Sequence, residues 1–297
     1  MGISLNRYII GVDGGGTGCR AALQSVDGRA ALRSQGGPAN FTTDPGTTLK
    51  NILTTLHALA GDPLFAEHKI EECVAHIGLA GVMDRADQDV IKKAVPFKHL
   101  TVSDDRETSV AGALGGHDGI LAAIGTGTII AARQTNQTRY FGGWGHHLSD
   151  QASGGWLGRA ALRHTMLAYD GLTERTELTT ALLAQFRNDP LEIVQFTANA
   201  EPGDVAKLAP IVVEKAKAGD AAATRLMKTG AEYIQSCIHV ADLPRDTAIC
   251  LAGGVGPHYE TYLDPPTRAQ IKPPEGTALD GALRLARAMY DRLEIKT

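Results

Sequence analysis

The sequence predicts an α/β protein made of two similar halves, and three observations lead to this prediction. A glycine-rich turn follows Asp13 between two apolar strands, and a second such turn begins at Gly125. Gly14 and Gly125 lie 111 residues apart, which is close to the length of one domain. In residues 1–113, three predicted strands are followed by alternating helices and strands, which is typical of a mixed sheet flanked by helices.

The composition is that of a globular protein and excludes several classes of partner. The 297 residues are enough for two domains, and 43% of them are hydrophobic and 21% charged. A net charge of −4 argues against nucleic acid as a main partner. No apolar run approaches the ~18 residues of a membrane span, and residues 1–7 lack the features of a signal peptide. Four scattered cysteines predict neither a zinc cluster nor a disulfide framework. We therefore expect a cytoplasmic protein without a nucleic-acid or membrane partner.

The elements of the first half follow from local pattern. Apolar residues 8–12 predict a strand, the consecutive glycines a tight turn, and residues 21–23 the returning strand. Asp44-Pro45 predicts the start of a helix that runs to about Ala60, because proline is favoured in the first helical turn. The remaining predicted elements are strands at 30–34, 74–79 and 100–102 and helices at 85–94 and 103–113.

A glycine-rich segment at 115–119 marks the boundary between the halves, which gives domains at 1–114 and 115–277. In the second domain, strands are predicted at 120–124, 129–133, 139–142 and 248–252, and helices at 156–169 and 221–240. A last helix is predicted at 278–293. Segment 257–275 contains five prolines and is predicted to be an irregular surface loop.

The glycine turns predict a site for nucleotide phosphates. The P-loop pattern and the G-x-G-x-x-G pattern are both absent, so phosphate would be bound through hairpin turns. Such turns expose several backbone N–H groups that an anion can approach closely. Asp13 beside bound phosphates would repel them unless a cation stands between, which points to Mg²⁺ held through water. The alternative is an Asp that only caps the turn.

Two adjacent carboxylates form the second candidate site. Asp104 and Asp105 follow a predicted strand where it passes into a helix, at the end of the sheet where α/β proteins place ligands. The helix dipole favours an ionised carboxylate there. Such a group could accept the proton of a substrate hydroxyl, as the catalytic Asp of a phosphotransferase does. A helix cap is the alternative role, and one of the pair could be the cap and the other the base.

A loop at 142–156 is unusually rich in Gly, Trp and His, and long loops in compact domains are commonly functional. The ring of Trp144 and the carboxylate of Asp150 suit a sugar, although Asp150 could also cap the following helix. His146 and His147 are adjacent, which is a poor spacing for a shared metal.

Two further positions are candidates for ligand contacts. Asn40, in an earlier glycine-rich loop, could hydrogen-bond a substrate hydroxyl. Gly253-Gly254 could let an adenosine lie flat against the backbone, or could be a plain strand-to-helix turn.

Seven short motifs follow one another over nearly the whole chain: Val12-Asp13-Gly14-Gly15-Gly16-Thr17, Gly37-Pro38-Ala39-Asn40, Gly78-Leu79-Ala80-Gly81, Ser103-Asp104-Asp105, Ile124-Gly125-Thr126-Gly127-Thr128, Gly142-Gly143-Trp144-Gly145-His146 and Leu251-Ala252-Gly253-Gly254-Val255. Together they resemble the BadF/BadG/BcrA/BcrD ATPase family, and within it the N-acetylglucosamine and glucosamine kinases. The family belongs to the actin-like/sugar kinase/Hsp70 ATPase superfamily. The resemblance implies two ribonuclease-H-like (actin-like ATPase) domains around a central cleft, with the helix at about 278–297 packing back on the first domain.

The resemblance also implies roles for individual residues. Asp105 fits the catalytic base better than Asp104 does, and Asp13 fits the carboxylate associated with Mg²⁺. Phosphate contacts are implied for Gly14, Gly15, Gly16, Thr17, Gly125, Thr126 and Gly127, and adenosine contacts for Gly253 and Gly254. Sugar contacts are implied for Asn40, Asp105, Trp144, Gly145 and Asp150.

Two differences from the family bear on the predicted substrate and on the branch of the family. The usual Gly-Asp-Glu-Gly-Ser reads Ser149-Asp150-Gln151-Ala152-Ser153 here, and this departure bears on sugar selectivity. The cysteines that hold an iron–sulfur cluster in the dehydratase-activating branch have no match.

We therefore expect a kinase that uses ATP and Mg²⁺ to phosphorylate an amino sugar, N-acetylglucosamine before others, at the C6 hydroxyl. The alternatives are glucosamine or another hexose as the substrate, a nucleotide-switched ATPase that drives a partner protein, and a sugar-binding regulator on the same scaffold. The sequence leaves a homodimer open.

Overall fold

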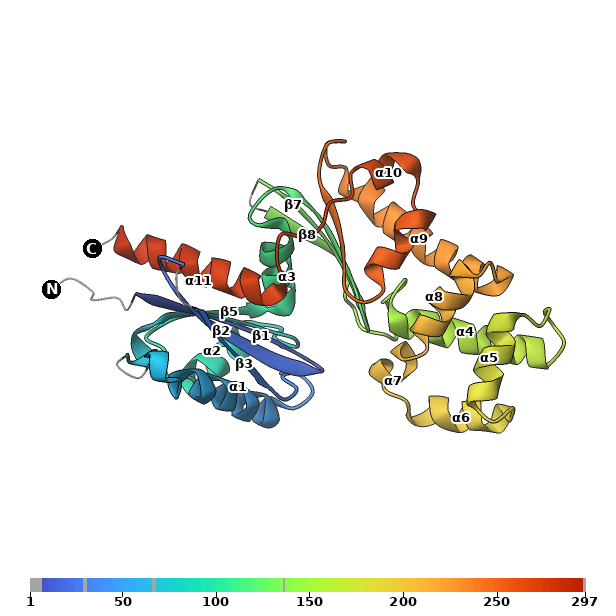
Figure 1. Cartoon of the computed structure of the whole chain (residues 1–297), viewed down its shortest axis with the longest axis horizontal. Coiled ribbons are helices and arrows are strands. Elements are labelled where there is room, and N and C mark those ends of the chain that lie inside the picture. The colour runs from blue at the N-terminus through green and yellow to red at the C-terminus, as the bar shows by residue number, and fades with distance from the viewer. Residues whose placement is uncertain (1–6, 29–30, 66–67, 136, 296–297) are drawn as a thin grey trace. The chain divides into compact units, whose positions relative to one another are not determined.

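A computed structural model describes residues 7–28, 31–65, 68–135 and 137–295. The chain divides into two compact units, one made of residues 1–116 and 274–297 and the other of residues 117–273. Each unit has its own sheet with helices packed on it (Figure 1). The predicted α/β class is therefore confirmed. Ala30, where the third strand was expected to begin, lies outside the described residues.

The first unit is built on a five-stranded sheet in the order β3-β2-β1-β4-β5. The first three strands form an antiparallel meander, and β4 and β5 run parallel to β1. The strands are β1 (Tyr8–Gly15), β2 (Gly18–Ser25), β3 (Ala31–Gly36), β4 (Val74–Leu79) and β5 (His99–Asp104).

Helices cover both faces of this sheet, with α1 (Pro45–Ala60) and α2 (Arg85–Ala94) on one face and α3 (Asp105–Leu114) and α11 (Ala278–Glu294) on the other (Figure 1). Strand side chains alternate between two cores, so Ile10 packs with α1 and α2 while its neighbour Ile9 packs with α11. Two short 3₁₀ helices lie at Pro63–Phe65 and Ile70–Glu72.

Glycines let the C-terminal helix α11 approach the sheet closely. A Cβ on Gly11 in β1 would lie 2.7 Å from the backbone nitrogen of Leu283 in α11. A Cβ on Gly112 in α3 would lie 2.0 Å from the backbone oxygen of Thr277, just before α11 begins. Larger side chains at either position would push the helix away, since real Cβ atoms do not come this near another atom.

The second unit is built on a four-stranded sheet in the order β8-β7-β6-β9. Its strands are β6 (Gly119–Ile124), β7 (Thr128–Gln134), β8 (Gln137–Gly142) and β9 (Ile249–Ala252), and only the β6–β9 pair is parallel among them. The rest of the unit is helical: α4 (Gly154–Tyr169), α5 (Glu177–Gln185), α6 (Pro190–Asn199), α7 (Pro202–Ala206), α8 (Ala209–Lys217), α9 (Ala221–Ala241) and α10 (Pro265–Ala269).

The prediction of an irregular surface loop at 257–275 was wrong. The segment contains part of a 3₁₀ helix, Gly256–Tyr262, and all of α10. Pro257, Pro265 and Pro266 sit in first helical turns, where proline favours a helix, and Asp264 caps α10 by accepting a hydrogen bond from the Thr267 N–H. Pro273 and Pro274 follow α10 in a segment that is not helical. Tyr259 is fully buried and its hydroxyl donates to the backbone oxygen of Ala152 at 2.7 Å.

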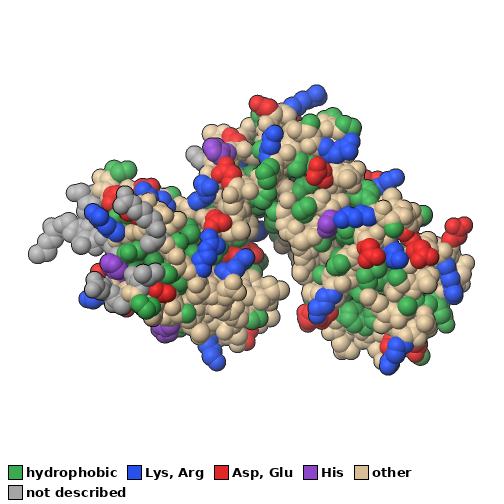
Figure 2. Space-filling model, viewed as in Figure 1, with side chains coloured by type: hydrophobic (Ala, Val, Ile, Leu, Met, Phe, Trp, Pro, Cys, Tyr) green, Lys and Arg blue, Asp and Glu red, His purple; other side chains and the backbone are tan. Residues whose placement is uncertain are grey.

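The surface carries charges of both signs. On the face shown in Figure 2, Lys and Arg side chains are intermixed with Asp and Glu side chains, and no extended basic patch is visible. Within the described parts of the chain, no helix combines the length and apolar character that crossing a membrane requires.

Candidate active site

The β1–β2 hairpin turns as the glycine run predicts. Gly15 pairs with Gly18 across the turn, so Gly16 and Thr17 form its tip. A Cβ on Gly15 or Gly16 would have nothing within 4 Å, which means that this backbone lies open to an approaching ligand. Gly14 differs, because its Cβ would lie 2.5 Å from the Leu79 side chain. Gly14 is therefore a packing glycine at the base of the turn.

This turn borders a cavity of about 500 Å³ within the first unit. The cavity brings four of the predicted site residues together: Asp13, Gly15, Thr17 and Asp105. Its other lining residues come from β2, β3, α3 and the start of α11: Gly18, Cys19, Arg20, Gln35, Gly36, Ser109 and Ala278. An open backbone turn and a carboxylate in one cavity are the parts that phosphoryl transfer requires.

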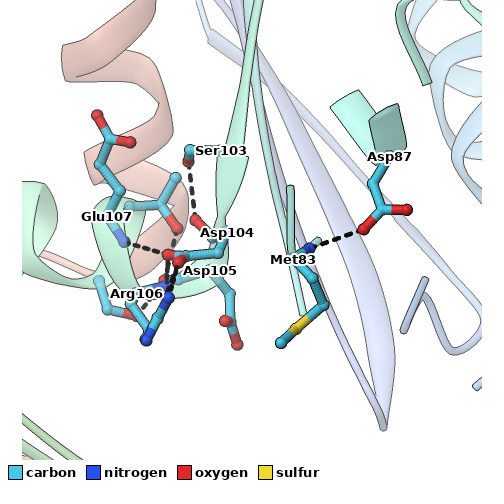
Figure 3. Close-up of polar contacts among 9 residues, drawn as sticks. Met83, Asp87, Ser103, Asp104, Asp105, Arg106 and Glu107 are labelled. Atoms are coloured by element: carbon cyan, nitrogen blue, oxygen red, sulfur yellow. Dashed lines mark hydrogen bonds and ion pairs between the residues drawn. The ribbon is translucent and has the colours of Figure 1, made fainter. Parts of the chain in front are cut away.

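Asp104 is the helix cap of the adjacent carboxylate pair. Its carboxylate accepts hydrogen bonds from the backbone N–H groups of Arg106 at 3.0 Å and Glu107 at 3.1 Å. The same carboxylate forms an ion pair with the Arg106 guanidinium. In Figure 3, the dashed contacts from Arg106 and Glu107 converge on Asp104. These contacts occupy Asp104, so the cap alternative holds for this member of the pair.

Asp105 is the first residue of α3, and its side chain lines the cavity. Burial and, to a smaller extent, the nearby charges of Asp104 and Asp13 together raise the pKa of its carboxyl to about 6. The helix start was expected to favour the ionised form, but desolvation outweighs the dipole here. A pKa near neutrality suits a general base, because such a group is ionised at pH 7 and still binds a proton well.

Asp13 faces the same cavity from the end of β1. It is 7% exposed, and its Oδ2 accepts from the Arg20 guanidinium at 2.5 Å. Within the described residues, no group of three or more His, Cys, Asp or Glu side chains could hold a metal ion directly. One carboxylate beside an open phosphate turn fits Mg²⁺ held mainly by water and phosphate oxygens, since this ion keeps much of its hydration.

Arg20 was missed by the sequence analysis. It lies directly across the hairpin from Asp13 in the antiparallel register, and its side chain is about half exposed. The sequence could have predicted this pairing, because a two-residue turn after Gly15 fixes which β2 residue faces Asp13.

Asn40 lies in the first unit, in a loop that forms a single parallel bridge with Ala80 beyond the end of β4. Its side-chain oxygen accepts from the backbone N–H groups of Thr42 at 3.1 Å and Thr43 at 3.2 Å. Because the oxygen is used in this turn, a hydrogen bond to a ligand would come from the amide nitrogen of Asn40.

The second glycine turn joins β6 and β7 in the other unit. The Gly125 N–H donates to the Gly127 oxygen at 2.9 Å, and the Gly125 oxygen accepts from the Gly154 N–H at 2.7 Å. Gly253 packs against the base of this turn with a φ of +82°, and a Cβ there would lie 2.3 Å from the Ile124 oxygen. Gly254 has no atom near its Cβ position. The turn, Gly253 and Gly254 thus lie together.

Asp150 supports this turn. Its Oδ1 accepts from the Thr128 N–H at 3.0 Å, and the ideal Cβ position of Gly127 lies 3.2 Å from the same oxygen. The alternative of Asp150 as a helix cap is wrong, because Ser153 caps α4 by accepting from the Trp156 N–H at 3.0 Å. The turn therefore holds the carboxylate through its Oδ1.

Trp144 and Gly145 lie in the loop between β8 and α4. The Trp144 side chain is 75% exposed, an unusual state for so large an apolar group. Gly145 has a φ of +84°, and its oxygen accepts from the Ser149 N–H at 2.8 Å, which closes the loop on itself.

Comparisons with known proteins identify a family and several relatives. The model of the BadF/BadG/BcrA/BcrD ATPase family matches residues 10–264. Glucosamine kinase GspK of Vibrio cholerae is 27% identical over 280 residues, which cover 94% of this chain and 95% of that protein.

Solved structures show the fold. A protein from Chromobacterium violaceum, provisionally named an N-acetylglucosamine kinase, matches with a TM-score of 0.86 at 33% identity over 94% of this chain and 99% of its own. A ROK family glucokinase from Streptomyces griseus, in complex with glucose and AMPPNP, matches with a TM-score of 0.57 at 19% identity over 95% and 99%. The predicted actin-like ATPase fold is thereby confirmed.

Proposed function

The chain belongs to the BadF/BadG/BcrA/BcrD ATPase family, and from this membership we propose that it is a kinase that transfers phosphate from ATP to an amino sugar. Relatives matched over nearly their whole length are named glucosamine kinase and N-acetylglucosamine kinase. The observation that supports the reaction most directly is Asp105, a carboxylate with a pKa near 6 in one cavity with an open glycine turn.

Asp105 acts as the general base. Its carboxylate accepts the proton of the sugar hydroxyl while the hydroxyl oxygen attacks the γ-phosphorus, and the bond to ADP breaks. The N–H groups around Gly15, Gly16 and Thr17 hold phosphate oxygens and offset their charge. We propose the C6 hydroxyl of N-acetylglucosamine as the acceptor, with glucosamine or another hexose as the alternative.

Asp13 is the residue that would hold Mg²⁺, through water, beside these phosphates. When bound, the ion neutralises charge on the transferring group. Since the Arg20 guanidinium already pairs with Asp13, it would have to yield this oxygen or share the carboxylate. Removal of divalent ions by EDTA should abolish ADP release, and added Mg²⁺ should restore it. ADP release that persists in EDTA would remove Asp13 from this role.

The remaining contacts are proposals of the same kind. The turn at Gly125, Thr126 and Gly127 would bind phosphate, and the neighbouring Gly253 and Gly254 would bind adenosine. Asn40, Trp144, Gly145 and Asp150 would contact the sugar. An exposed indole ring suits the C–H face of a pyranose, and a carboxylate suits its hydroxyls. A cytoplasmic location and a homodimer also stay predictions.

A screen of sugars against ADP release tests the proposal. Glucosamine, N-acetylglucosamine, glucose and N-acetylmannosamine are compared at the same concentration, with a reaction lacking sugar as the blank. An amino-sugar kinase releases ADP only with its sugar. ADP release at the same rate in the blank would indicate a partner-driven ATPase, and sugar binding without any ADP release would indicate a regulator.

A further inference from the structure

A series of hydrogen-bonded polar side chains leads to the junction of β5 and α3, where Asp105 begins the helix. His76 on β4 is 3% exposed, and its ring nitrogens contact two hydroxyls of the neighbouring strand β5. Nδ1 lies 2.8 Å from Thr101 Oγ1, and Nε2 lies 3.0 Å from Ser103 Oγ. The Ser103 hydroxyl in turn donates to the backbone oxygen of Asp104 at 2.8 Å. The series thus ends on the residue immediately before Asp105.

The parallel register of β4 and β5 creates this arrangement. His76 pairs with Thr101, and Gly78 pairs with Ser103, so these positions share one face of the sheet. Helix α3 covers that face, since a Cβ on Gly78 would lie 2.3 Å from the Thr108 side chain. His76 therefore lies on the face of the sheet that α3 and α11 cover.

The direction of each hydrogen bond follows from a count of protons. A carbonyl oxygen only accepts, so the single hydroxyl proton of Ser103 is used on Asp104. Ser103 Oγ must then accept from His76, which places the ring proton on Nε2. Burial lowers the pKa of His76 to about 4, so the ring is neutral and Nδ1 is an acceptor. Thr101 Oγ1 therefore donates to Nδ1.

We propose that His76 is a positioning residue of the active site, which as its Nε2–H tautomer orients Ser103 and through it the backbone that carries Asp105. The oxygen of Asp104 and the nitrogen of Asp105 belong to one planar peptide unit. A hydrogen bond that holds the Asp104 oxygen limits rotation of this peptide unit. It therefore fixes the position of the Asp105 Cα, from which the carboxylate side chain extends. This inference rests on the proposed role of Asp105 as the base.

The position of the Asp105 backbone matters because the Asp105 carboxylate must lie within hydrogen-bond distance of one sugar hydroxyl. A misplacement of about 1 Å in such a group can cost roughly 10²-fold in rate. A histidine used only to fill the core would be replaceable by an apolar side chain of similar size. The two roles therefore make different predictions for the same variants.

The experiment compares Ser103→Ala, His76→Leu and His76→Gln with the wild type. Ser103→Ala removes the hydroxyl that holds Asp104, and His76→Leu removes the donor to Ser103. Gln carries an N–H at its end that can take the place of Nε2–H. Ser34→Ala is the matched control, because the Ser34 hydroxyl also donates to a backbone oxygen at 2.8 Å, that of Thr55 in α1.

We expect Ser103→Ala and His76→Leu to lower kcat by about 10-fold or more while KM for ATP changes less than about twofold. His76→Gln should recover most of the lost kcat, and Ser34→Ala should keep wild-type kcat. Should His76→Leu fail to fold, Ser103→Ala still makes the test. Wild-type kcat in folded Ser103→Ala, or equal kcat in folded Gln and Leu variants, would overturn the proposal.

Nitrogen-15 NMR of the histidine ring provides a readout independent of turnover. The wild type should show His76 protonated on Nε2 and not on Nδ1, and a proton on Nδ1 would overturn the proposal. Failure of the proposed function has a different signature, since the wild type itself would then phosphorylate no sugar.

Discussion

Replacement of Asp105 by Asn should separate catalysis from folding more sharply than any other single change. Asn keeps the size of the side chain and leaves the hydrogen bonds that Thr108 and Ser109 donate to the backbone oxygen of residue 105. It removes the group that accepts the hydroxyl proton. General-base catalysis contributes about 10²–10⁴-fold, so kcat should fall by that factor while KM for ATP changes little.

The same substitution should stabilise the protein. The pKa of Asp105 rises from 3.8 to about 6 on folding, and each unit corresponds to about 1.4 kcal/mol. Because the folded pKa is the higher one, the folded state binds more protons between these pH values, and stability falls as pH rises through this window. At pH 7 the charged carboxylate costs up to about 3 kcal/mol, and partial solvent screening reduces this to about 1–2 kcal/mol. Asn avoids this cost.

Turnover by coupled ADP release and thermal unfolding at pH 7 measure both effects on the same samples. Asp104→Asn is the control: it keeps a side chain that caps α3 and should retain most of kcat. The account predicts a large loss of turnover with a raised Tm for Asp105→Asn alone. Near wild-type kcat in this variant, or a loss of kcat that parallels a lowered Tm, would refute the reasoning.

Three further predictions concern the candidate site and the core of the second unit. Because Asp105 must be ionised to act, kcat/KM should fall about tenfold between pH 7 and pH 5 with an apparent pKa near 6, and a pH–rate profile that is flat over this range would contradict the assignment. Gly15→Ala adds a methyl group in open space beside the cavity, so it should raise KM for ATP by about tenfold without lowering Tm; an unchanged KM would place the phosphates elsewhere. Tyr259→Phe leaves the buried oxygen of Ala152 without its donor, so chemical denaturation should show a loss of about 1–3 kcal/mol in unfolding free energy, and no loss would show that the bond contributes little.

Much of the fold could be read from the chain because its signals are local. The glycine run after Asp13 predicts the first hairpin, and Asp44-Pro45 predicts the start of α1 through capping and a fixed φ. In segment 257–275 the prolines were read as breakers. Pro257, Pro265 and Pro266 lie in first helical turns instead, and the burial of Tyr259 depends on core residues distant in sequence.

The residue pattern alone left open which of Asp104 and Asp105 is the cap and which the base, and the family resemblance favoured Asp105 as the base. The cap geometry adds that Asp104 is engaged with Arg106 and Glu107. His76 gave no signal at all, because its role depends on the register of two strands 25 residues apart in sequence.

The identity of the phosphorylated product tests the central claim most directly. Phosphorus-31 NMR follows the γ-phosphate of ATP in reactions with N-acetylglucosamine, with glucosamine and without sugar. The account predicts that the phosphate appears as a sugar phosphate ester and that ATP stays intact when sugar is left out. Phosphate released only as the inorganic ion, at a rate that sugar does not change, would contradict it.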